Sequence, residues 1–509
     1  MPDIVLTTLN AKFIHAAFGL RYLFANLGEL QPRAVIAEFD INLRPLDIAE
    51  MLLAREPKII GLGVYIWNVA ETTEVISAIK KLRPEIKIIL GGPEVSYETE
   101  GQPIVELADH VITGEADLKF AGVCRQLLGG ESLPDKIILA ELPDFSRIAL
   151  PYDYYTEADI AHRIVYVEAS RGCPFTCEFC LSSLDIPVRQ VPLDQFLAAM
   201  QRLMDRGLKQ FKFVDRTFNL NIAVSQALLE FFLARHQPGR FYHFEMIPDR
   251  LPAELREVIA QFPPGSLQFE VGIQTFNPEV GALISRRQNY ERMADNFNYL
   301  RNETSVHIHA DLIVGLPGET LESFAAGFDR LIALGPQEIQ VGILKRLRGT
   351  PIMRHDAAWQ MVYSAQPPYE ILQNKLLDFA LMQRLRRFAK YWDLVGNSGN
   401  FVETLPLIWR DGSPFVNFFR FSNWLYAQLG RTDSIALVRL AEKIFEFLTS
   451  ELKADAKFAA EQLWLDWQRG GHRDPPEKIR AYLSDEKSSR PRSSKSTLPK
   501  RQARHLAVP

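Results

Sequence analysis

Mostly apolar runs alternate with stretches of helical periodicity over the first 130 residues. The runs cover residues 4–8, 35–39, 59–64, 86–90 and 110–113, and an amphipathic segment follows each of them. Such runs are typical of parallel strands that are buried on both faces of a sheet. The alternation therefore predicts a doubly wound α/β domain with a parallel sheet over residues 1–135.

The loops that follow these runs form the predicted ligand site of the first domain. Ligands of doubly wound sheets bind beyond the carboxyl ends of the strands. Gly91 and Gly92 follow the fourth run, and Gly114 follows the fifth. Glycine lets the backbone approach a ligand closely, so these three residues are candidates for contact with a cofactor.

A second series of strand and helix patterns begins after a linker at residues 136–160. Its predicted strands cover residues 164–169, 211–214, 241–246, 267–273, 306–314 and 339–343, within a domain at 161–345. Six successive βα units form either a second open sheet or a partial barrel. Periodicity does not decide between these two architectures.

The strand pattern stops near residue 345. Residues 346–475 read as helices rich in Trp, Phe and Leu, which predicts a helical C-terminal cap. Residues 484–509 are rich in Ser, Pro, Lys and Arg without apolar periodicity, so we expect a disordered basic tail.

Composition places the chain among folded, water-soluble proteins. Of its 509 residues, 47% are hydrophobic and 24% are charged, and the formal net charge is −4. This balance does not call for a nucleic-acid or anionic-membrane partner. No apolar stretch is long enough to span a bilayer and no signal peptide precedes the first domain, so we expect a cytoplasmic protein without a membrane partner.

The cysteines carry the most specific chemical signal. Three of the four, Cys173, Cys177 and Cys180, form a C-x3-C-x2-C run directly after a predicted strand. Three thiolates leave one coordination position of a cubane iron–sulfur cluster open for a substrate or cosubstrate. The alternatives are a zinc knuckle that borrows a histidine, or buried cysteines without metal. Cys124 lies at helical spacing with apolar neighbours, which indicates core packing.

This run resembles the signature of the radical SAM superfamily, which has an aromatic residue, here Phe179, before the last cysteine. The resemblance covers roughly residues 160–345. It implies a partial (β/α)6 barrel, a [4Fe-4S] cluster on the three cysteines, and S-adenosylmethionine (SAM) chelated to the open iron. One electron from the cluster then cleaves SAM to a 5′-deoxyadenosyl radical, so the cofactor supplies the difficult chemistry.

Shorter stretches are similar to the oxygen-independent coproporphyrinogen oxidase branch of that superfamily. They are residues 244–246 (FEM), 272–277 (GIQTFN) and 311–318 (DLIVGLPG), together with Arg286. The resemblance implies that Glu245, Gln274, Arg286 and Asp311 bind SAM, whereas the alternative for each is a structural contact. The chain departs from the family after the second strand, where Asp215 stands in place of a glycine pair. Asp215 either accepts the methionine ammonium group or forms a local turn with Arg216.

The first domain resembles the cobalamin-binding domain that precedes many radical SAM barrels. The matching residues are Gly91 and Gly92 after the fourth strand and Gly114 after the fifth, and the resemblance implies cobalamin as a further cofactor. The D-x-H-x-x-G motif that supplies a histidine ligand to cobalt is absent, so we expect the lower axial position to be open or otherwise filled. His15 is the nearest candidate ligand, with a helix-start residue as the alternative.

The cap resembles the C-terminal region of an uncharacterised subgroup of cobalamin-type radical SAM proteins. The similarity rests on residues 345–351 (KRLRGTP) and 391–401 (YWDLVGNSGNF), and it implies no substrate. Trp392, Asn397 and Asn400 either line a pocket or serve as packing and turn residues.

These features predict a radical SAM enzyme that uses cobalamin to methylate or otherwise modify an unactivated centre of an unknown substrate, which is either a small molecule or of a class that the sequence does not identify. A reducing partner such as flavodoxin or ferredoxin is implied, and nucleic acid is not an expected partner. Methylthiotransferases carry further cysteines for a second cluster, and only Cys124 remains here. A non-methylating radical oxidoreductase or cyclase stays open as an alternative, as does a cobalamin-responsive regulator with a structural cluster.

Overall fold

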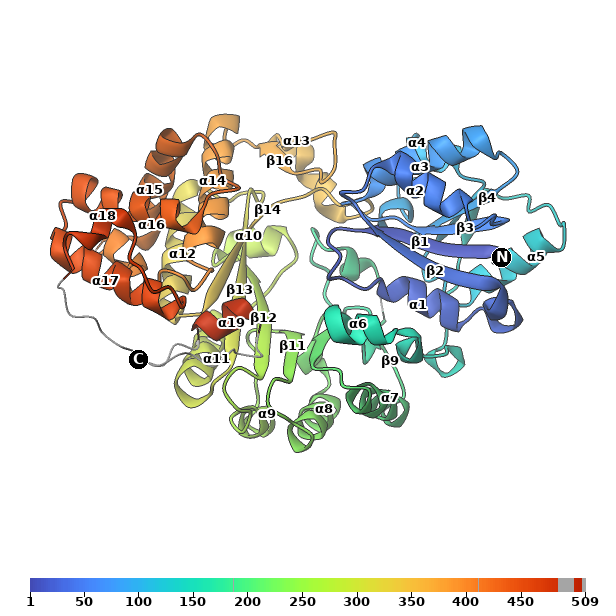
Figure 1. The fold of residues 1–509 in the computed structure, drawn as a ribbon, viewed down its shortest axis with the longest axis horizontal. Coiled ribbons are helices and arrows are strands. Elements are labelled where there is room, and N and C mark those ends of the chain that lie inside the picture. Colours follow the sequence, from blue (N-terminus) through green and yellow to red (C-terminus); the bar gives the residue numbers. More distant parts are fainter. Residues whose placement is uncertain (186, 411, 484–498, 506–509) are drawn as a thin grey trace. The chain divides into compact units, whose positions relative to one another are not determined.

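The computed structural model describes residues 1–185, 187–410, 412–483 and 499–505 (Figure 1). Contacts within the chain divide it into two compact units. The first unit comprises Met1–Arg216 with the short segments Lys345–Met353 and Ser364–Glu370. The second unit comprises Thr217–Leu344, Arg354–Tyr363 and Ile371–Pro509. Each unit therefore contains segments that are distant in sequence.

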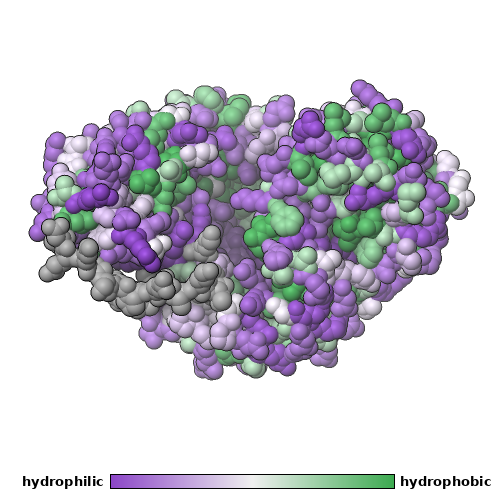
Figure 2. All heavy atoms as spheres, viewed as in Figure 1, coloured by the Kyte–Doolittle hydropathy of each residue, from purple (hydrophilic) through white to green (hydrophobic). Residues whose placement is uncertain are grey.

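The surface of the protein is mainly polar. Figure 2 shows one face on which hydrophilic residues predominate and hydrophobic residues form scattered clusters. Every helix among the described residues is too short or too polar to cross a lipid bilayer.

The first sheet is parallel and has the strand order β2-β1-β3-β4-β5-β6. Its strands are β1 (Ile4–Asn10), β2 (Ala34–Asp40), β3 (Ile59–Gly63), β4 (Lys87–Gly91), β5 (His110–Thr113) and β6 (Ile137–Leu139). The connecting helices are α1 (Phe18–Ala25), α2 (Pro45–Leu53), α3 (Val69–Leu82), α4 (Pro103–Leu107) and α5 (Lys119–Leu128). The predicted doubly wound domain is confirmed, and β6 adds an edge strand within the stretch that we expected to be a linker.

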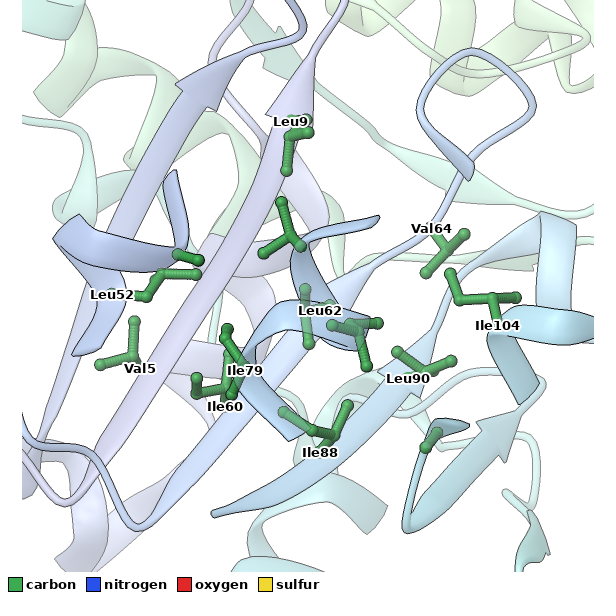
Figure 3. Close-up of a cluster of buried hydrophobic side chains, with 14 of the residues drawn as sticks. Val5, Leu9, Leu52, Ile60, Leu62, Val64, Ile79, Ile88, Leu90 and Ile104 are labelled. Atoms are coloured by element: carbon green, nitrogen blue, oxygen red, sulfur yellow. The ribbon is translucent and has the colours of Figure 1, made fainter. Parts of the chain in front are cut away.

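Apolar side chains cover both faces of this sheet. One cluster, drawn in Figure 3, packs Val5, Ile60 and Ile88 of the strands against Leu52 of α2 and Ile79 of α3. A second cluster on α1 and α5 includes Ile4, Leu20, Ile112 and Phe120. Burial on both faces explains why the strands read as nearly continuous apolar runs.

The second sheet has the order β14-β13-β12-β11-β10-β7 and leaves its two end strands unpaired with each other. Its strands are β7 (Val165–Val167), β10 (Gln210–Phe213), β11 (Phe241–Met246), β12 (Leu267–Gln274), β13 (His307–Val314) and β14 (Glu338–Ile343). The six strands lie within or close to the predicted ranges. The partial barrel implied by the family resemblance is confirmed, because the parallel strands pair in chain order without the reversal of the first sheet.

Helices follow the strands of the barrel as a βαβ series requires. They are α7 (Leu193–Asp205), α8 (Ile222–Ala234), α9 (Ala253–Ile259), α10 (Pro278–Leu283), α11 (Tyr290–Glu303) and α12 (Leu321–Leu334), whereas α6 (Glu157–His162) precedes the first strand. Two short antiparallel pairs accompany them, β8 (Ser170–Arg171) with β9 (Arg189–Gln190), and β15 (Val362–Tyr363) with β16 (Ile371–Gln373).

The C-terminal region is helical, as predicted. Its helices are α13 (Asp356–Trp359), α14 (Phe379–Val395), α15 (Pro414–Leu429), α16 (Leu437–Glu446), α17 (Ala456–Arg469) and α18 (Glu477–Arg480). Aromatic side chains join it to α12, since Trp392 packs edge-on against Phe328 and Phe418 with ring centroids 4.8 and 4.9 Å apart. Trp392 is therefore a packing residue.

A further helix, α19 (Lys500–His505), lies within the stretch that we expected to be disordered. Arg501 forms ion pairs with Glu338 at 3.1 Å and with Asp393 at 2.9 Å, and His505 Nε2 lies 3.0 Å from the Asn397 carbonyl oxygen. These contacts order the segment beside β12 and β13 (Figure 1). Residues 484–498 and 506–509 of the predicted tail lie outside the described residues.

The Asn397 side chain provides hydrogen-bond partners for backbone groups at the outer edge of β14. Its side-chain amide accepts a hydrogen bond from the Ile339 backbone N–H at 2.8 Å and donates one to the Ile339 carbonyl at 2.9 Å. The side chain is buried, with 3% of its residue surface exposed. Asn397 thus replaces a neighbouring strand, and this contact explains the residue without invoking a pocket.

We expect Asn397→Ala to destabilise the second unit, because a buried backbone donor and acceptor each lose a partner at a cost of about 1–3 kcal/mol per group. Thermal unfolding measures the change. Asn400→Ala, at a half-buried position three residues further on, is the matched control and should leave the midpoint nearly unchanged. Equal midpoints for the two variants would contradict the edge-pairing role.

Glu319 joins the loops that follow β12 and β13. Its carboxylate Oε1 accepts hydrogen bonds from the Thr275 hydroxyl at 2.7 Å and from the Ser323 hydroxyl at 3.1 Å. Oε2 is buried without a hydrogen-bond partner among the described residues. Burial therefore raises the pKa of Glu319 to about 7.

This raised pKa predicts a pH-dependent stability. In the unfolded chain the carboxyl ionises near pH 4.5, whereas in the folded chain it keeps its proton up to about pH 7. Stability should therefore fall as the pH rises between these values, by roughly 3 kcal/mol. Glu319→Gln, which cannot ionise, should remove that loss, and its advantage over the wild type in thermal unfolding should grow from pH 4.5 to pH 8. Exposed Glu322→Gln is the control, and parallel curves for Glu319→Gln and wild type would contradict the assignment.

Candidate active site

The three clustered cysteines lie on a loop of the first unit that begins after β8. Cys173 and Cys177 are buried, with 8% and 6% exposure, and Cys180 is half-buried. The Cys173 N–H donates to the Asp185 carbonyl at 3.0 Å, and the Cys180 N–H donates to the Cys177 carbonyl at 3.1 Å. Phe179, the aromatic residue of the motif, is half-buried beside Cys180. These hydrogen bonds fold the loop back on itself. Its three cysteines are partly or largely shielded from water.

The donor set fits a cubane cluster better than a single metal ion. None of the four cysteines forms a disulfide. No trio of Cys, His, Asp or Glu side chains among the described residues is arranged to hold one ion. In a cubane each thiolate binds a different iron, so three sulfurs on one loop need not converge on a point. Cys124 is fully buried in the α5 core, and burial raises the pKa of its thiol to about 12, so it does not belong to this set.

Asp215 lies at the end of β10, where it supports the start of the cysteine loop. Its carboxylate accepts hydrogen bonds from the Ala169 N–H at 3.0 Å and from the Ser170 hydroxyl at 2.6 Å. Burial raises the pKa of Asp215 to about 7. These contacts give Asp215 a structural role between β7 and β8, and a contact with the ammonium group of SAM stays a prediction.

The other predicted SAM-binding residues lie on one polar face of the second unit. Side chains alternate along β11, β12 and β13, so that polar and apolar residues take opposite faces. The pairing register sets Glu245 opposite Glu270, and Gly272 opposite Asp311. Three predicted positions, Glu245, Gln274 and Asp311, thus belong to neighbouring strands.

Gln274 and Arg286 meet at the carboxyl end of β12. A Cβ built on Gly272 would lie 2.6 Å from Gln274 Nε2 and 3.4 Å from an Arg286 guanidinium nitrogen. Arg286 also donates to the Gly272 carbonyl. Gln274 has φ +70°, and the strand bulges between Gly272 and Gln274. The bulge redirects the Gln274 side chain, as bulges beside active sites commonly do.

Several polar residues of this face were not singled out in the sequence. His243 pairs with Glu270 at 3.1 Å, His307 pairs with Glu338 at 2.9 Å, and His309 lies 3.5 Å from Asp311. Although burial opposes ionisation, the His307 hydrogen bond and the nearby cations lower the pKa of Glu338 to about 2. The signal for His307 and His309 was the polar–apolar alternation of HIHADLIV at 307–314.

The first unit contains a cavity of about 370 Å³ beside the carboxyl ends of its sheet. Glycines of three strand ends line it, namely Gly61, Gly63, Gly91, Gly92 and Gly114, together with Leu20, Ile89, Ile112 and Phe120. Glu168, Arg171 and Asp185, which flank the cysteine loop, line it as well. The predicted glycines are thus brought together around one largely apolar cavity.

Two of these glycines are required by the backbone. Gly92 has φ +108°, and a Cβ there would lie 2.5 Å from the Val64 carbonyl oxygen. Gly114 has φ +80°, with the Ala140 carbonyl oxygen 3.2 Å from the position of a Cβ. Gly91 differs, because a Cβ there would meet only the Ile112 carbonyl oxygen, at 3.7 Å. Bulk can therefore be added at Gly91 without a backbone collision.

His15 is not among the residues that line this cavity. His15 pairs with Ile164 in a β-bridge, and its Nδ1 lies 2.7 Å from the Tyr166 hydroxyl oxygen. It therefore stands in a bridge before α1 and not at a helix start. Among the described residues, the cavity lining includes no histidine, cysteine or methionine.

Three families match successive parts of the chain. The B12 binding domain family matches residues 4–123, the radical SAM superfamily matches residues 167–331, and a protein family of unknown function (DUF4080) matches residues 357–506. The cobalamin-binding domain, the radical SAM domain and their cofactors, which were expected from the sequence, are confirmed at the level of the family.

Two curated relatives are similar to part of the chain. An uncharacterized methyltransferase of Pyrococcus horikoshii is 24% identical over 332 residues, which cover 60% of this chain and 71% of that protein. The ribosomal protein uS12 methylthiotransferase of Carboxydothermus hydrogenoformans is 26% identical over 263 residues, which cover 49% of this chain and 57% of that protein. The chain thus spans just over half of the methylthiotransferase.

Two solved structures share the fold. OxsB, a cobalamin-dependent SAM radical enzyme with aqua-cobalamin bound, superposes with a TM-score of 0.61 at 13% identity and covers 99% of this chain and 84% of its own. TsrM of Kitasatospora setae, a radical SAM methyltransferase, gives 0.57 at 17% identity, with 74% and 80% covered. Successive parts of the chain thus match a B12 binding domain, a radical SAM domain and a C-terminal DUF4080 domain.

Proposed function

We propose that the protein is a radical SAM enzyme that uses cobalamin to methylate an unactivated carbon or phosphorus centre of a small-molecule substrate. One observation carries the proposal. The glycine-lined cavity of the B12-type domain reaches Glu168, Arg171 and Asp185, which flank the cysteine loop, so both predicted cofactor sites share residues of one compact unit. The two similar proteins named as methyltransferases favour methylation over other radical reactions.

Each part of the chain has a distinct task in this proposal. Cys173, Cys177 and Cys180 hold the cluster, and the polar sheet face with Glu245, Gln274, Arg286 and Asp311 binds SAM. Carboxylates suit ribose hydroxyls, and a guanidinium suits the methionine carboxylate. When bound, the cluster supplies one electron for SAM cleavage and cobalamin supplies a transferable methyl group.

The cavity suits the nucleotide arm of cobalamin. Its volume of about 370 Å³ is too small for the whole cofactor but lies within the range of small-ligand pockets. Largely apolar walls suit a flat heterocycle, and the glycines at the strand ends leave room for a corrin beside them. Gly91, Gly92 and Gly114 are therefore proposed to contact cobalamin.

The proposal extends to the surroundings of the enzyme. A one-electron reductant such as flavodoxin or ferredoxin would reduce the cluster. Cysteines that form no disulfide are typical of a reducing compartment, which favours the cytoplasm. The basic residues near the C-terminus lack interleaved aromatic residues, so they give no support to a nucleic-acid partner.

The reaction class is tested by anaerobic reconstitution. We expect the wild-type protein to bind about one cubane cluster and, once reduced with SAM, to release 5′-deoxyadenosine detectable by chromatography. Cys177→Ala should lose both the iron and the nucleoside, because the loop has no fourth thiol to replace the ligand. Cys124→Ala, the matched control, should keep both.

Two outcomes would overturn this assignment. Equal loss of iron from the Cys124 and Cys177 variants would contradict a cluster held by three cysteines. A fully reconstituted and reduced protein that yields no nucleoside would favour the regulator with a structural cluster.

Cobalamin binding is tested at Gly91, where bulk avoids the backbone. We expect Gly91→Leu to weaken binding roughly tenfold or more in equilibrium dialysis, since the side chain would enter the cavity. The wild type should gain about 2.7 kcal/mol of stability at a hundredfold excess of cobalamin over its dissociation constant. The bound form should show the absorption of cobalt without an imidazole or benzimidazole ligand, because the sequence lacks the D-x-H-x-x-G motif and the nucleotide arm would lie in the cavity.

The control is Gly122→Leu on α5, where a Cβ has no neighbour within 4 Å. It should bind cobalamin as the wild type does. If the wild type retained no cobalamin, the methyltransferase proposal would fail and a non-methylating radical enzyme would take its place.

A further inference from the structure

Arg171 stands two residues before the first cysteine of the cluster loop. It ends the short strand β8, and Gly172 connects it to Cys173. Gly172 has φ +90°, and a Cβ there would lie 2.7 Å from the Asp185 carbonyl oxygen and 2.8 Å from that of Pro187. The Cys173 N–H is itself bonded to the Asp185 carbonyl. Because Gly172 packs tightly against two backbone carbonyl groups, a displacement of Arg171 would also move Cys173.

Carboxylates and aromatic rings surround the Arg171 guanidinium. Two of its nitrogens bind the Asp117 carboxylate, at 2.9 and 3.1 Å, and a third bonds Glu168 at 2.8 Å. Glu115 accepts a further hydrogen bond at 2.9 Å. The guanidinium carbon lies 4.5 Å from the Tyr22 ring centroid and 5.1 Å from that of Phe145. This planar, multiply bonded arrangement requires arginine and not lysine.

The carboxylates that bind Arg171 come from the cofactor cavity. Glu115 and Asp117 belong to the loop after β5, directly beyond Gly114, and both line the cavity, as does Arg171 itself. One buried side chain thus connects the wall of the proposed cobalamin site to the base of the cysteine loop.

Arg189 forms a second connection between the same two places. It pairs with Glu115 on the cavity side and with Asp185 at 2.7 Å on the loop side. Asp185 holds the Cys173 N–H through its carbonyl oxygen. Two independent paths therefore lead from Glu115 to Cys173.

The burial of these charges makes the arrangement specific. The side chains of Arg171, Asp117 and Glu168 are 15%, 8% and 7% exposed. Removing one partner of a buried ion pair leaves an uncompensated charge, so alternative positions of the loop are strongly disfavoured. A ligand that orders the loop after β5 would accordingly also order the cysteine loop.

We propose that Arg171 is a positioning residue that couples cobalamin binding to assembly of the iron–sulfur site. This inference rests on the proposed function. Because coupling between two binding sites is reciprocal, the cluster should tighten cobalamin binding by the same factor by which cobalamin tightens the cluster.

The coupling is measured as a ratio of affinities in the full chain. Equilibrium dialysis gives the cobalamin dissociation constant of the cluster-free protein and of the anaerobically reconstituted protein. We expect the reconstituted wild type to bind cobalamin on the order of 5- to 150-fold more tightly, the range typical of coupled sites. A purely structural role for Arg171 would alter stability and leave this ratio unchanged.

Two conservative variants isolate the contact. Arg171→Lys keeps the positive charge but loses the two-nitrogen contact with the Asp117 carboxylate. Asp117→Asn keeps the shape of the side chain but removes the negative charge on the cavity side. In both, the ratio should fall below the wild-type value, because only the path through Arg189 stays intact, while each cofactor still binds alone. If Arg171→Lys failed to fold, Asp117→Asn would decide. The exposed pair of Arg202 with Asp153 supplies the matched controls Arg202→Lys and Asp153→Asn, which should keep the wild-type ratio.

The outcomes separate this inference from the proposed function. A wild type that retains no cobalamin would refute the proposed function. A wild type that binds cobalamin with equal affinity in both states, or variants that keep the wild-type ratio, would overturn the role of Arg171 alone. The electron paramagnetic resonance spectrum of the reduced cluster gives a second readout, since cobalamin addition should change it more in the wild type than in Arg171→Lys.

Discussion

Parallel strand pairing is the constraint on which the sites of this protein depend. When all strands of a sheet run in the same direction, all of their carboxyl ends lie at one edge. In the first sheet that edge carries Gly63, Gly91, Gly92 and Gly114, and a cavity lies beside it. In the second sheet it carries Gln274, and the Thr275–Glu319 contact joins two of its loops. The strand topology thus determines where each site lies, and the individual residues come second.

Buried polar side chains determine the strand registers and loop positions that the hydrophobic core does not determine. Apolar packing is non-directional, so it buries elements without setting a single register or loop position. Asn397 satisfies the edge of β14, Asp215 holds the start of the cysteine loop, and Arg171 joins that loop to the cavity. Each of them makes at least two directional contacts at low exposure, which is where a misplaced polar group is most costly.

The second sheet combines two environments through the two-residue period of its strands. Alternate residues of β13 either pack into the apolar layer or present His307, His309 and Asp311 on the polar face. A face of this kind can bind a charged, hydroxyl-rich cosubstrate while the opposite face stabilises the fold. It also explains how α19 can pack there through Arg501 and Gln502, which contact Glu338 and Gln268.

The sequence by itself determined the two α/β sheets, the helical cap, and the cysteine motif with the cofactor chemistry that it implies. These features are encoded locally, in the alternation of strand and helix patterns and in the spacing of Cys173, Cys177 and Cys180. Only the tertiary structure decided that Asn397 pairs with a strand edge, that residues 500–505 form a helix, and that Arg171 meets Asp117. Those contacts join residues 54 to 163 positions apart, and no periodic pattern encodes such pairs, because their energy depends on burial and geometry that arise only after the chain has folded.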